Sequence, residues 1–392
     1  MLISISIVLL SGLVFGWLCK KIHLPSLFGM IIAGVIIGPG VLNLLDDNLL
    51  AISSDLRRIA LIIILIRAGL KLDISDLKKV GRPAVLMCFV PACCEVIGMV
   101  LLAPKLLGLT TLDAAILGAV IGAVSPAVVV PRMIRLIDEG YGAREGVPQM
   151  ILAGASVDDV FVIVLFTTFT SLALGDHVSV MSFVNVPISI LSGVLTGALC
   201  GWGLSFLFGK TKMSTPTKVI VMFIISFILN WLEGVQALIP FAGLIAIMAA
   251  GTMIKRNEEK LAKELSQAFD YLWVPAEIFL FVLVGASVAI ESVKDAGAVS
   301  VILILLVLVF RMAGVCLCTL GTSLAKKERL FCMLAYTPKA TVQAAIGGLP
   351  LAMGLSCGNT VLTVSVIAIL ITAPLGAFAI DASYRKLLRK AD

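Results

Sequence analysis

Residues 123–129 read Ala-Val-Ser-Pro-Ala-Val-Val, and residues 335–341 read Ala-Tyr-Thr-Pro-Lys-Ala-Thr. In each segment a hydroxyl residue precedes a proline, deep in an apolar stretch that is long enough to cross a bilayer. Proline removes a backbone hydrogen bond and clashes with the carbonyl one turn back, and it pushes the preceding residue toward extended geometry. The pattern therefore predicts two broken helices, one interrupted at Pro126 and the other at Thr337 and Pro338.

The composition places the whole chain in a membrane. Of its 392 residues, 60% are hydrophobic and 14% are charged, and the mean hydropathy is +1.12, which lies outside the range of soluble domains. Windows of about 20 apolar residues predict about thirteen transmembrane helices, and so an all-α polytopic fold with residues 1–392 as a single transmembrane domain. The predicted spans begin near Leu2, Pro25, Leu56, Pro83, Leu112, Val147, Phe183, Lys218, Val235, Tyr271, Ala298, Leu330 and Thr360.

The basic residues predict how the chain is oriented. Most of the 30 Lys and Arg residues fall in alternate loops and in the C-terminal tail, whereas the opposite loops hold few, such as Lys105 and Lys294. Cytoplasmic loops carry an excess of Lys and Arg. We therefore predict a multi-pass protein of the cell membrane, in a bacterium the inner membrane, with its N-terminus outside and its C-terminus cytoplasmic. The net charge of +6 then reports this topology, not nucleic-acid binding.

The two proline breaks lie on spans that run in opposite directions, because one predicted span runs inward and the other outward. Broken helices of opposite direction are typical of inverted-topology repeats, whose breaks meet near the midplane. We predict two six-helix repeats, spans 1–6 and 8–13, with broken helices crossed near Pro126 and Pro338. The expected core bundle covers about residues 83–174 and 297–385, and the expected scaffold bundle about residues 1–70 and 183–290.

Span 7 carries a row of small residues. Gly193, Gly197 and Gly201 recur at every fourth position, which places them on one face of a helix. Small residues at this spacing let two helix backbones approach closely in a membrane. The sequence predicts close packing on this face and leaves the partner helix open.

Two adjacent acids, Asp158 and Asp159, lie in the middle of the apolar stretch of residues 147–173. A charged side chain at the bilayer centre costs about 2.5 to 3.5 kcal/mol even on the insertion scale, so such residues need a partner, a proton or a cation. Glu95, Arg311 and Lys339 are also predicted at membrane depth. With three acids against two bases, one carboxylate remains free to take up a proton or a small cation.

The acids and the second break together resemble a known family. Asp158 and Asp159 lie on the span after the one broken at Ser-Pro, and residues 337–345 read Thr-Pro-Lys-Ala-Thr-Val-Gln-Ala-Ala. This combination resembles the cation/proton antiporter superfamily, which has the sodium/hydrogen exchanger fold. The residues around Lys339 are closest to those of its NHA-type sodium/proton antiporters. The resemblance extends over nearly the whole chain.

The resemblance implies roles for individual residues. Asp159 matches the family's principal ion- and proton-binding carboxylate, Asp158 matches an acid that engages a basic residue, and Lys339 matches the basic residue on the second broken helix. Arg311 stands where NHA-type members carry an arginine that pairs with an acid matching Glu95, a pairing that the repeat symmetry and the charge balance also favour. We predict a structural or gating ion pair between Glu95 and Arg311, and charge compensation of Asp158 by Lys339.

These residues predict a secondary active Na⁺ (or Li⁺)/H⁺ antiporter, in which a proton and a cation compete for one buried aspartate while the core bundle gives alternating access. Hard cations prefer oxygen ligands. The predicted ion- and proton-binding site therefore comprises Asp159, Asp158, Ser125 and Ser156, with the transported Na⁺ held by the two aspartates.

Other functions fit parts of the sequence. A K⁺/H⁺ antiporter and a sodium-coupled organic-anion symporter of similar fold both remain open, and a channel is a third alternative. An intramembrane aspartyl protease needs two facing carboxylates, whereas neighbouring residues on a helix point about 100° apart. We therefore expect a transporter and not an enzyme.

The expected partners follow from this function. They are a monovalent cation, a proton and the lipid bilayer, with no cofactor and no nucleic acid. The resemblance also implies a homodimer formed through the scaffold, which the family uses for this purpose.

Overall fold

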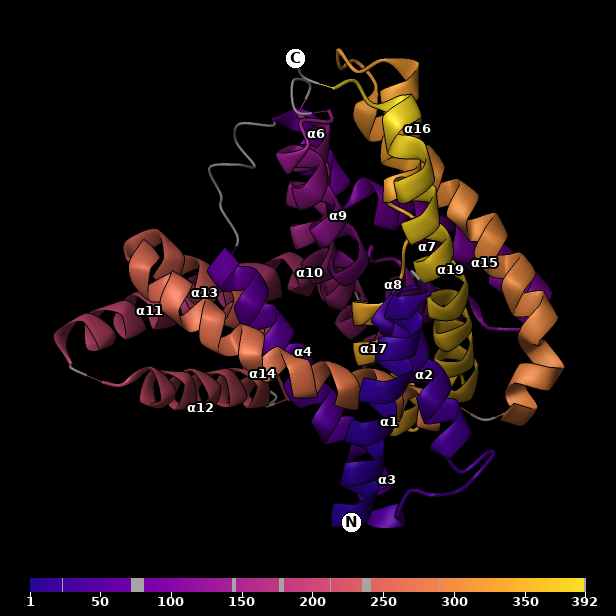
Figure 1. Cartoon of the computed structure of the whole chain (residues 1–392), viewed down its shortest axis with the longest axis horizontal. Helices are drawn as coiled ribbons and strands as arrows, with labels where there is room; N and C mark the ends of the chain where they lie inside the picture. Colours follow the sequence, from indigo (N-terminus) through magenta and orange to yellow (C-terminus); the bar gives the residue numbers. More distant parts are fainter. Residues whose placement is uncertain are drawn as a thin grey trace. The chain divides into compact units, whose positions relative to one another are not determined.

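The computed structural model describes residues 1–22, 24–71, 81–142, 146–175, 180–211, 213–234, 241–288 and 290–390. In this part of the chain the regular elements are helices (Figure 1), apart from an isolated β-bridge between Tyr141 and Lys390. The predicted all-α fold is therefore confirmed. The helices in chain order are α1 (Leu2–Lys21), α2 (Ser26–Ile37), α3 (Asp47–Ala51), α4 (Ser53–Lys71), α6 (Arg82–Met87), α7 (Val90–Leu107), α8 (Thr111–Ile121), α9 (Pro126–Asp138), α10 (Val147–Ala173), α11 (Val180–Lys210), α12 (Thr215–Gly234), α13 (Gly243–Asn257), α14 (Glu259–Ala286), α15 (Ile290–Thr319), α16 (Lys326–Ala335), α17 (Thr341–Ile346), α18 (Leu349–Ala352) and α19 (Gly358–Leu387).

Many of these helices suit a bilayer. Nine helical segments among the described residues are long and apolar enough to cross a membrane. They are Leu2–Lys21, Arg82–Leu107, Thr111–Asp138, Val147–Ala173, Leu191–Lys210, Thr215–Glu233, Glu259–Ala286, Gly297–Thr319 and Gly358–Leu387. Two shorter apolar segments, Ser26–Ile37 and Thr341–Ala352, coincide with further predicted spans. The chain is thus a multi-pass membrane protein.

The chain divides into two compact units. The first consists of Met1–Arg57, Ile74–Leu174 and Ile278–Asp392, and the second of Arg58–Asp73 and Gly175–Glu277. The residues that the sequence singles out at membrane depth, from Glu95 to Lys339, all belong to the first unit.

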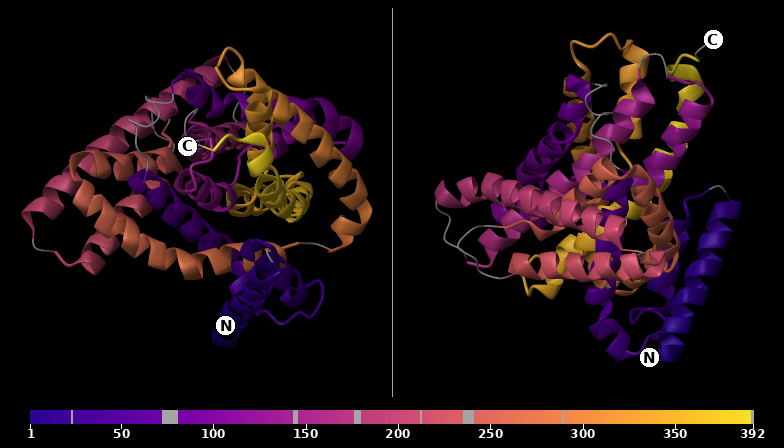
Figure 2. Two further views of the ribbon diagram at one scale, coloured as in Figure 1. Left: turned by 45° about the horizontal axis from the view of Figure 1, so that its top comes forward. Right: turned by 90° about the vertical axis from the view of Figure 1, so that its left-hand side faces the viewer.

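The first unit places α7 against α15 and α8 (Figure 2). Gly98 of α7 makes room for Phe310 of α15, because a Cβ atom at Gly98 would lie 2.7 Å from Cγ of Phe310. This close packing brings the buried faces of α7 and α15 together, with Glu95 on one helix and Arg311 on the other. Both side chains are almost fully buried.

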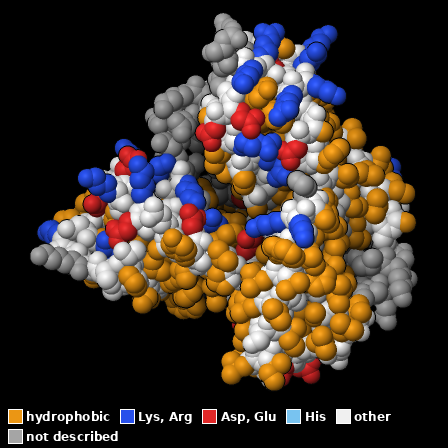
Figure 3. Space-filling view, in the orientation of Figure 1, with side chains coloured by type: hydrophobic (Ala, Val, Ile, Leu, Met, Phe, Trp, Pro, Cys, Tyr) orange, Lys and Arg blue, Asp and Glu red, His pale blue; other side chains and the backbone are white. Residues whose placement is uncertain are grey.

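The surface of the first unit separates apolar and basic side chains. Residues such as Leu10, Leu13 and Trp17 of α1 are more than half exposed, and hydrophobic side chains cover the visible face of this helix (Figure 3). Lys and Arg side chains gather instead where α16 begins and where α9 and α19 end. The first helix begins and the last helix ends at opposite ends of this unit (Figures 1 and 2).

In the second unit α11 packs on α13 through the predicted glycine face. A Cβ atom at Gly197 would lie 2.7 Å from Cα of Ala246, and one at Gly201 would lie 2.9 Å from Cα of Ala250. Small residues on both helices therefore let the two backbones touch. The partner that the sequence left open is α13.

Candidate functional site

The first predicted break interrupts the path from α8 to α9. The helix α8 ends at Ile121, and α9 begins at Pro126, with Ser125 in extended geometry (φ −85°, ψ 110°) as its N-cap. Proline is tolerated at the first position of a helix because its missing N–H has no partner there. The proline that breaks one helix thus starts the next, as its position in the sequence predicts.

The second break separates α16 from α17. The helix α16 ends at Ala335 and α17 begins at Thr341, so that Pro338 and Lys339 lie on the irregular segment between them. The backbone N–H of Lys339 donates to Oγ1 of Thr372 on α19, at 2.9 Å. A side chain of the neighbouring helix therefore satisfies a backbone group that the break leaves free.

The two breaks touch each other. The backbone N–H of Ser125 donates to the carbonyl oxygen of Pro338 at 2.8 Å, so one extended segment crosses the other inside the first unit. Helix ends that meet in this way offer free backbone groups to polar ligands at a depth where lipid offers none. The crossing is the centre around which the charged residues are arranged.

The helix α19 packs against the second break. A Cβ atom at Gly376 would lie 2.5 Å from Cγ and 2.9 Å from Cδ of Pro338. We expect Gly376→Ala to lower the free energy of unfolding by about 1 to 3 kcal/mol, since an added methyl group overpacks the site. Thermal unfolding in detergent measures the change. Gly203→Ala on α11 is the matched control, because no atom of the described residues lies within 4 Å of its Cβ position. An unchanged stability of the Gly376→Ala protein would contradict the close contact.

The side chain of Arg311 binds two carboxylates and a backbone carbonyl oxygen at each of the two breaks. Its Nη1 lies 2.7 Å from Oε2 of Glu95, and its Nη2 lies 2.9 Å from Oδ2 of Asp158. It also donates to the carbonyl oxygen of Tyr336 from Nε at 2.6 Å and to that of Gly122 from Nη1. A guanidinium has five N–H donors in a rigid fork, which explains how one side chain serves four acceptors.

The partners of Asp158 and Lys339 differ from the prediction. The predicted pair of Glu95 and Arg311 is present, but Nζ of Lys339 lies 2.5 Å from Oε2 of Glu95 and does not pair with Asp158. Asp158 pairs with Arg311 instead. The physical reason is that the arginine fork reaches two carboxylates, which leaves Glu95 shared between both bases. The prediction that Lys339 compensates Asp158 directly was therefore wrong.

Asp159 lies outside this four-residue network. Glu95 and Asp158 balance Arg311 and Lys339, two negative charges against two positive charges. The Oδ1 atoms of Asp158 and Asp159 are both buried without a hydrogen-bond partner among the described residues. Asp159 therefore takes no part in this balance of charges.

Further unpaired oxygens lie on the residues of the crossing. Buried hydroxyl or amide oxygens of Ser125, Thr341 and Gln343 have no hydrogen-bond partner in the described part of the chain. Unpaired buried acceptors are costly unless something binds them. Ser156 lies on α10, but its side chain falls outside the described residues, so its predicted part in the site stays a prediction.

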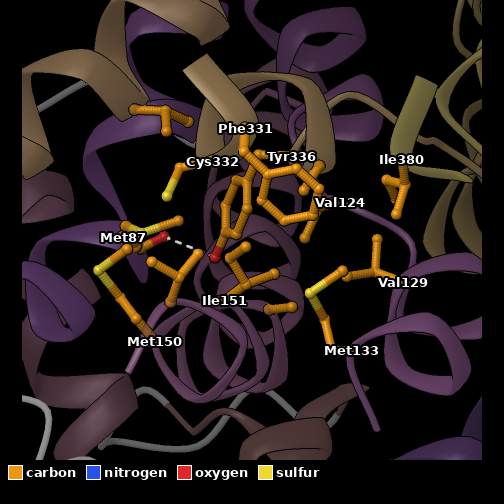
Figure 4. Close-up of a cluster of buried hydrophobic side chains, with 14 of the residues drawn as sticks. Met87, Val124, Val129, Met133, Met150, Ile151, Phe331, Cys332, Tyr336 and Ile380 are labelled. Carbon is orange, nitrogen blue, oxygen red and sulfur yellow. Dashed lines mark hydrogen bonds between the residues drawn. The ribbon is translucent and has the colours of Figure 1, made fainter. Parts of the chain in front are cut away.

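An apolar cluster lies beside the second break. Tyr336 is fully buried and its phenol group donates to the carbonyl oxygen of Met87 at 3.2 Å (Figure 4). The labelled neighbours in Figure 4 include Met150, Ile151 and Phe331, and all are buried. This cluster surrounds the residue whose backbone carbonyl binds Arg311, and so fixes that part of the break.

Comparison with known proteins identifies the family. Residues 5–382 match the transmembrane domain of the sodium/hydrogen exchangers. Sodium/hydrogen exchanger 9B2 of Homo sapiens is 33% identical over 381 residues, which cover 94% of this chain and 71% of that protein. Sodium/hydrogen exchanger 9B1 of Homo sapiens is 31% identical over 412 residues, covering 99% and 78%. The chain belongs to the sodium/hydrogen exchanger family.

The fold agrees with this family. The sodium proton antiporter MjNhaP1 from Methanocaldococcus jannaschii superimposes with a TM-score of 0.85 at 20% identity, covering 98% of this chain and 97% of that one. Because the chain belongs to the sodium/hydrogen exchanger family, it is a secondary transporter of a monovalent cation and protons, not an enzyme. The predicted membership of the cation/proton antiporter superfamily is confirmed.

Sequence reasoning missed several residues of the crossing in this exchanger. Gln343 donates from Nε2 to the carbonyl oxygens of Ile121 and Ala123, and Thr372 binds the backbone of Lys339. A signal for Gln343 was present, because it is a polar residue in an apolar span two positions after Thr341. Thr372 carries no such signal, since a lone threonine in a membrane helix commonly binds its own backbone.

Proposed function

We propose that this exchanger moves Na⁺ or Li⁺ in one direction and H⁺ in the other, and that both ions compete for Asp159. The observation that supports this proposal most directly is the position of Asp159. Its Oδ1 is buried without a hydrogen-bond partner among the described residues, beside a network whose charges already cancel. A carboxylate in that situation favours a proton or a cation as its partner.

Two oxygens near the crossing support a small, hard cation. Oδ1 of Asp158 and Oγ of Ser125 have no hydrogen-bond partner among the described residues. Asp158 accepts from the backbone N–H of Val124 at the first break, and the backbone N–H of Ser125 donates to Pro338 at the second. Hard cations take oxygen ligands. We therefore propose that Asp159, Asp158, Ser125 and Ser156 bind the transported Na⁺, while Lys339 and the Glu95–Arg311 pair hold the surrounding charge.

The proposed movement is alternating access of a core bundle. The core comprises about residues 83–174 and 297–385, moving against a scaffold of about residues 1–70 and 183–290 that also forms a homodimer. Two six-helix inverted repeats, with about thirteen transmembrane helices in all, would supply the symmetry for the two states. The crossed breaks near Pro126 and Pro338 support such repeats.

The proposed orientation puts the C-terminus in the cytoplasm and the N-terminus outside. Lys and Arg side chains gather where α9 and α19 end and where α16 begins, and basic residues favour the cytoplasmic face. The first helix begins at the opposite end of the first unit. Both observations support this orientation in a cell membrane.

Reconstitution into proteoliposomes tests the function. A pH-sensitive dye inside the vesicles reports proton movement when NaCl, LiCl or KCl is added outside, with and without a clamped membrane potential. We expect Na⁺ and Li⁺ to move protons. A response to K⁺ alone would replace the proposal with K⁺/H⁺ exchange, and no response to any of the three cations would reject antiport.

A further inference from the structure

Gln343 is almost completely buried on α17 and joins the two broken helices. Its Nε2 donates to the carbonyl oxygen of Ile121 at 3.1 Å and to that of Ala123 at 2.9 Å. Both carbonyls lie where α8 ends, so they have no partner within the helix. The side-chain amide therefore satisfies two backbone groups that the first break sets free.

One of these carbonyls belongs to the peptide group that holds Asp158. The peptide between Ala123 and Val124 accepts from Gln343 at its oxygen and donates from its N–H to Oδ2 of Asp158 at 2.8 Å. A planar peptide with two anchored ends has little freedom to rotate. Hydrogen bonds in such a chain also polarise one another, which strengthens each of them.

The fixed peptide determines which oxygen of Asp158 stays free. Oδ2 is taken by the N–H of Val124 and by Nη2 of Arg311. Oδ1 is left buried and without a partner among the described residues. Rotation of the 123–124 peptide would remove one of the two donors to Oδ2, so that Arg311 alone would fix the orientation of the carboxylate.

We propose that Gln343 is a positioning residue that sets the affinity for the transported cation through the 123–124 peptide and Asp158. This inference rests on the proposed function. In this role Gln343 acts on the cation through Asp158, since both of its N–H donors bind backbone carbonyls of the first break. An amide suits this position, since it offers two N–H donors without a charge.

Two substitutions separate this role from a purely structural one. Gln343→Met keeps the length of the side chain and removes both donors. Gln343→Glu keeps the shape, but its carboxylate repels the two carbonyls when ionised and donates one hydrogen bond when protonated. Ser365→Ala is the matched control, because Ser365 is equally buried and its hydroxyl donates within its own helix, to the carbonyl oxygen of Val361.

Sodium-dependent proton movement in proteoliposomes, measured from pH 6 to 9, gives the apparent KM for Na⁺ and the maximal rate. We expect Gln343→Met to raise the KM about tenfold at every pH, with a smaller change in the maximal rate. For Gln343→Glu, the ratio of its KM to that of the wild type should increase with pH. Ser365→Ala should match the wild type.

A double-mutant cycle tests the route through Asp158. Sodium-dependent thermal stabilisation in detergent reports binding without turnover. Gln343→Met should weaken sodium binding in the wild type and have less than about a twofold effect in Asp158→Asn, because coupled residues are not additive. If Asp158→Asn itself abolishes the thermal stabilisation by sodium, the cycle cannot be completed. The pH dependence of the KM of Gln343→Glu then tests the inference.

The inference is overturned if the two Gln343 variants keep the wild-type KM, or if the effect of Gln343→Met is equally large in Asp158→Asn. These outcomes differ from a failure of the proposed function, in which the wild-type protein itself shows no cation-dependent proton movement. Melting temperatures of all variants, measured without sodium, identify any protein that fails to fold.

Discussion

Asp159→Asn is expected to abolish cation/proton exchange while leaving the protein folded. Asparagine keeps the shape of the side chain but binds no proton near neutral pH and carries no charge for a cation. Asp159 takes no part in the network of Glu95, Asp158, Arg311 and Lys339. Its substitution therefore leaves both buried basic residues with their acidic partners. The dye assay in proteoliposomes measures exchange, and the melting temperature in detergent measures folding.

Asp158→Asn is the matched comparison, since it makes the same replacement of a carboxylate by an amide in the neighbouring acid. An asparagine oxygen still accepts from Val124, but the pair with Arg311 loses its negative partner. We expect reduced stability and weakened exchange, not its complete loss. If Asp158→Asn were inactive and Asp159→Asn active, the assignment of the two acids would be reversed.

Arg311→Met is expected to destabilise the protein by about 3 to 5 kcal/mol, because removing one partner of a buried ion pair leaves an uncompensated charge. Methionine retains the apolar part of the side chain. Asp158 then has no basic partner, whereas Glu95 keeps Lys339 at 2.5 Å. The backbone carbonyls of Gly122 and Tyr336 also lose a donor. Yield after extraction and thermal unfolding in detergent measure the loss.

A second substitution distinguishes the two acids that contact Arg311. Adding Asp158→Asn to Arg311→Met should restore part of the lost stability, since it removes the stranded charge. Adding Glu95→Gln should not restore stability, since it leaves Lys339 without its acidic partner. Equal rescue by both would contradict the sharing of Glu95 between two bases.

The sequence alone identified the two breaks and the charged residues around them. Proline at a fixed place in an apolar span interrupts a helix through local sterics, so Pro126 and Pro338 could be found without knowing their neighbours. Lone charges at membrane depth are equally visible, because lipid penalises them wherever they point. These signals depend on one residue and its span.

The ion-pair partner of each buried charged residue could not be predicted in this way. Which carboxylate faces Lys339 depends on the direction in which the irregular segment after Pro338 presents its side chain, and on how far the fork of Arg311 reaches across α7 and α10. Neither follows from spacing along the chain. The predicted pairing of Asp158 with Lys339 was wrong because one guanidinium binds both acids.

The packing of the helices could be predicted only in part from the sequence. The glycine row of α11 predicted close contact, but its partner α13 became clear only from the structure. The span expected from Pro83 onward is also divided, with α6 ending at Met87 and α7 beginning at Val90. Pro91, in the first turn of α7, is compatible with a helix start there.

The charge network has a consequence for the synthesis of the protein. Asp158 precedes Arg311 by 153 residues, and Glu95 precedes Lys339 by 244. A ribosome therefore delivers the acids of the first half to the membrane well before the bases that neutralise them. Such distant contacts form late in folding. The buried acids of the N-terminal half therefore gain their basic partners only when the last quarter of the chain has been synthesised.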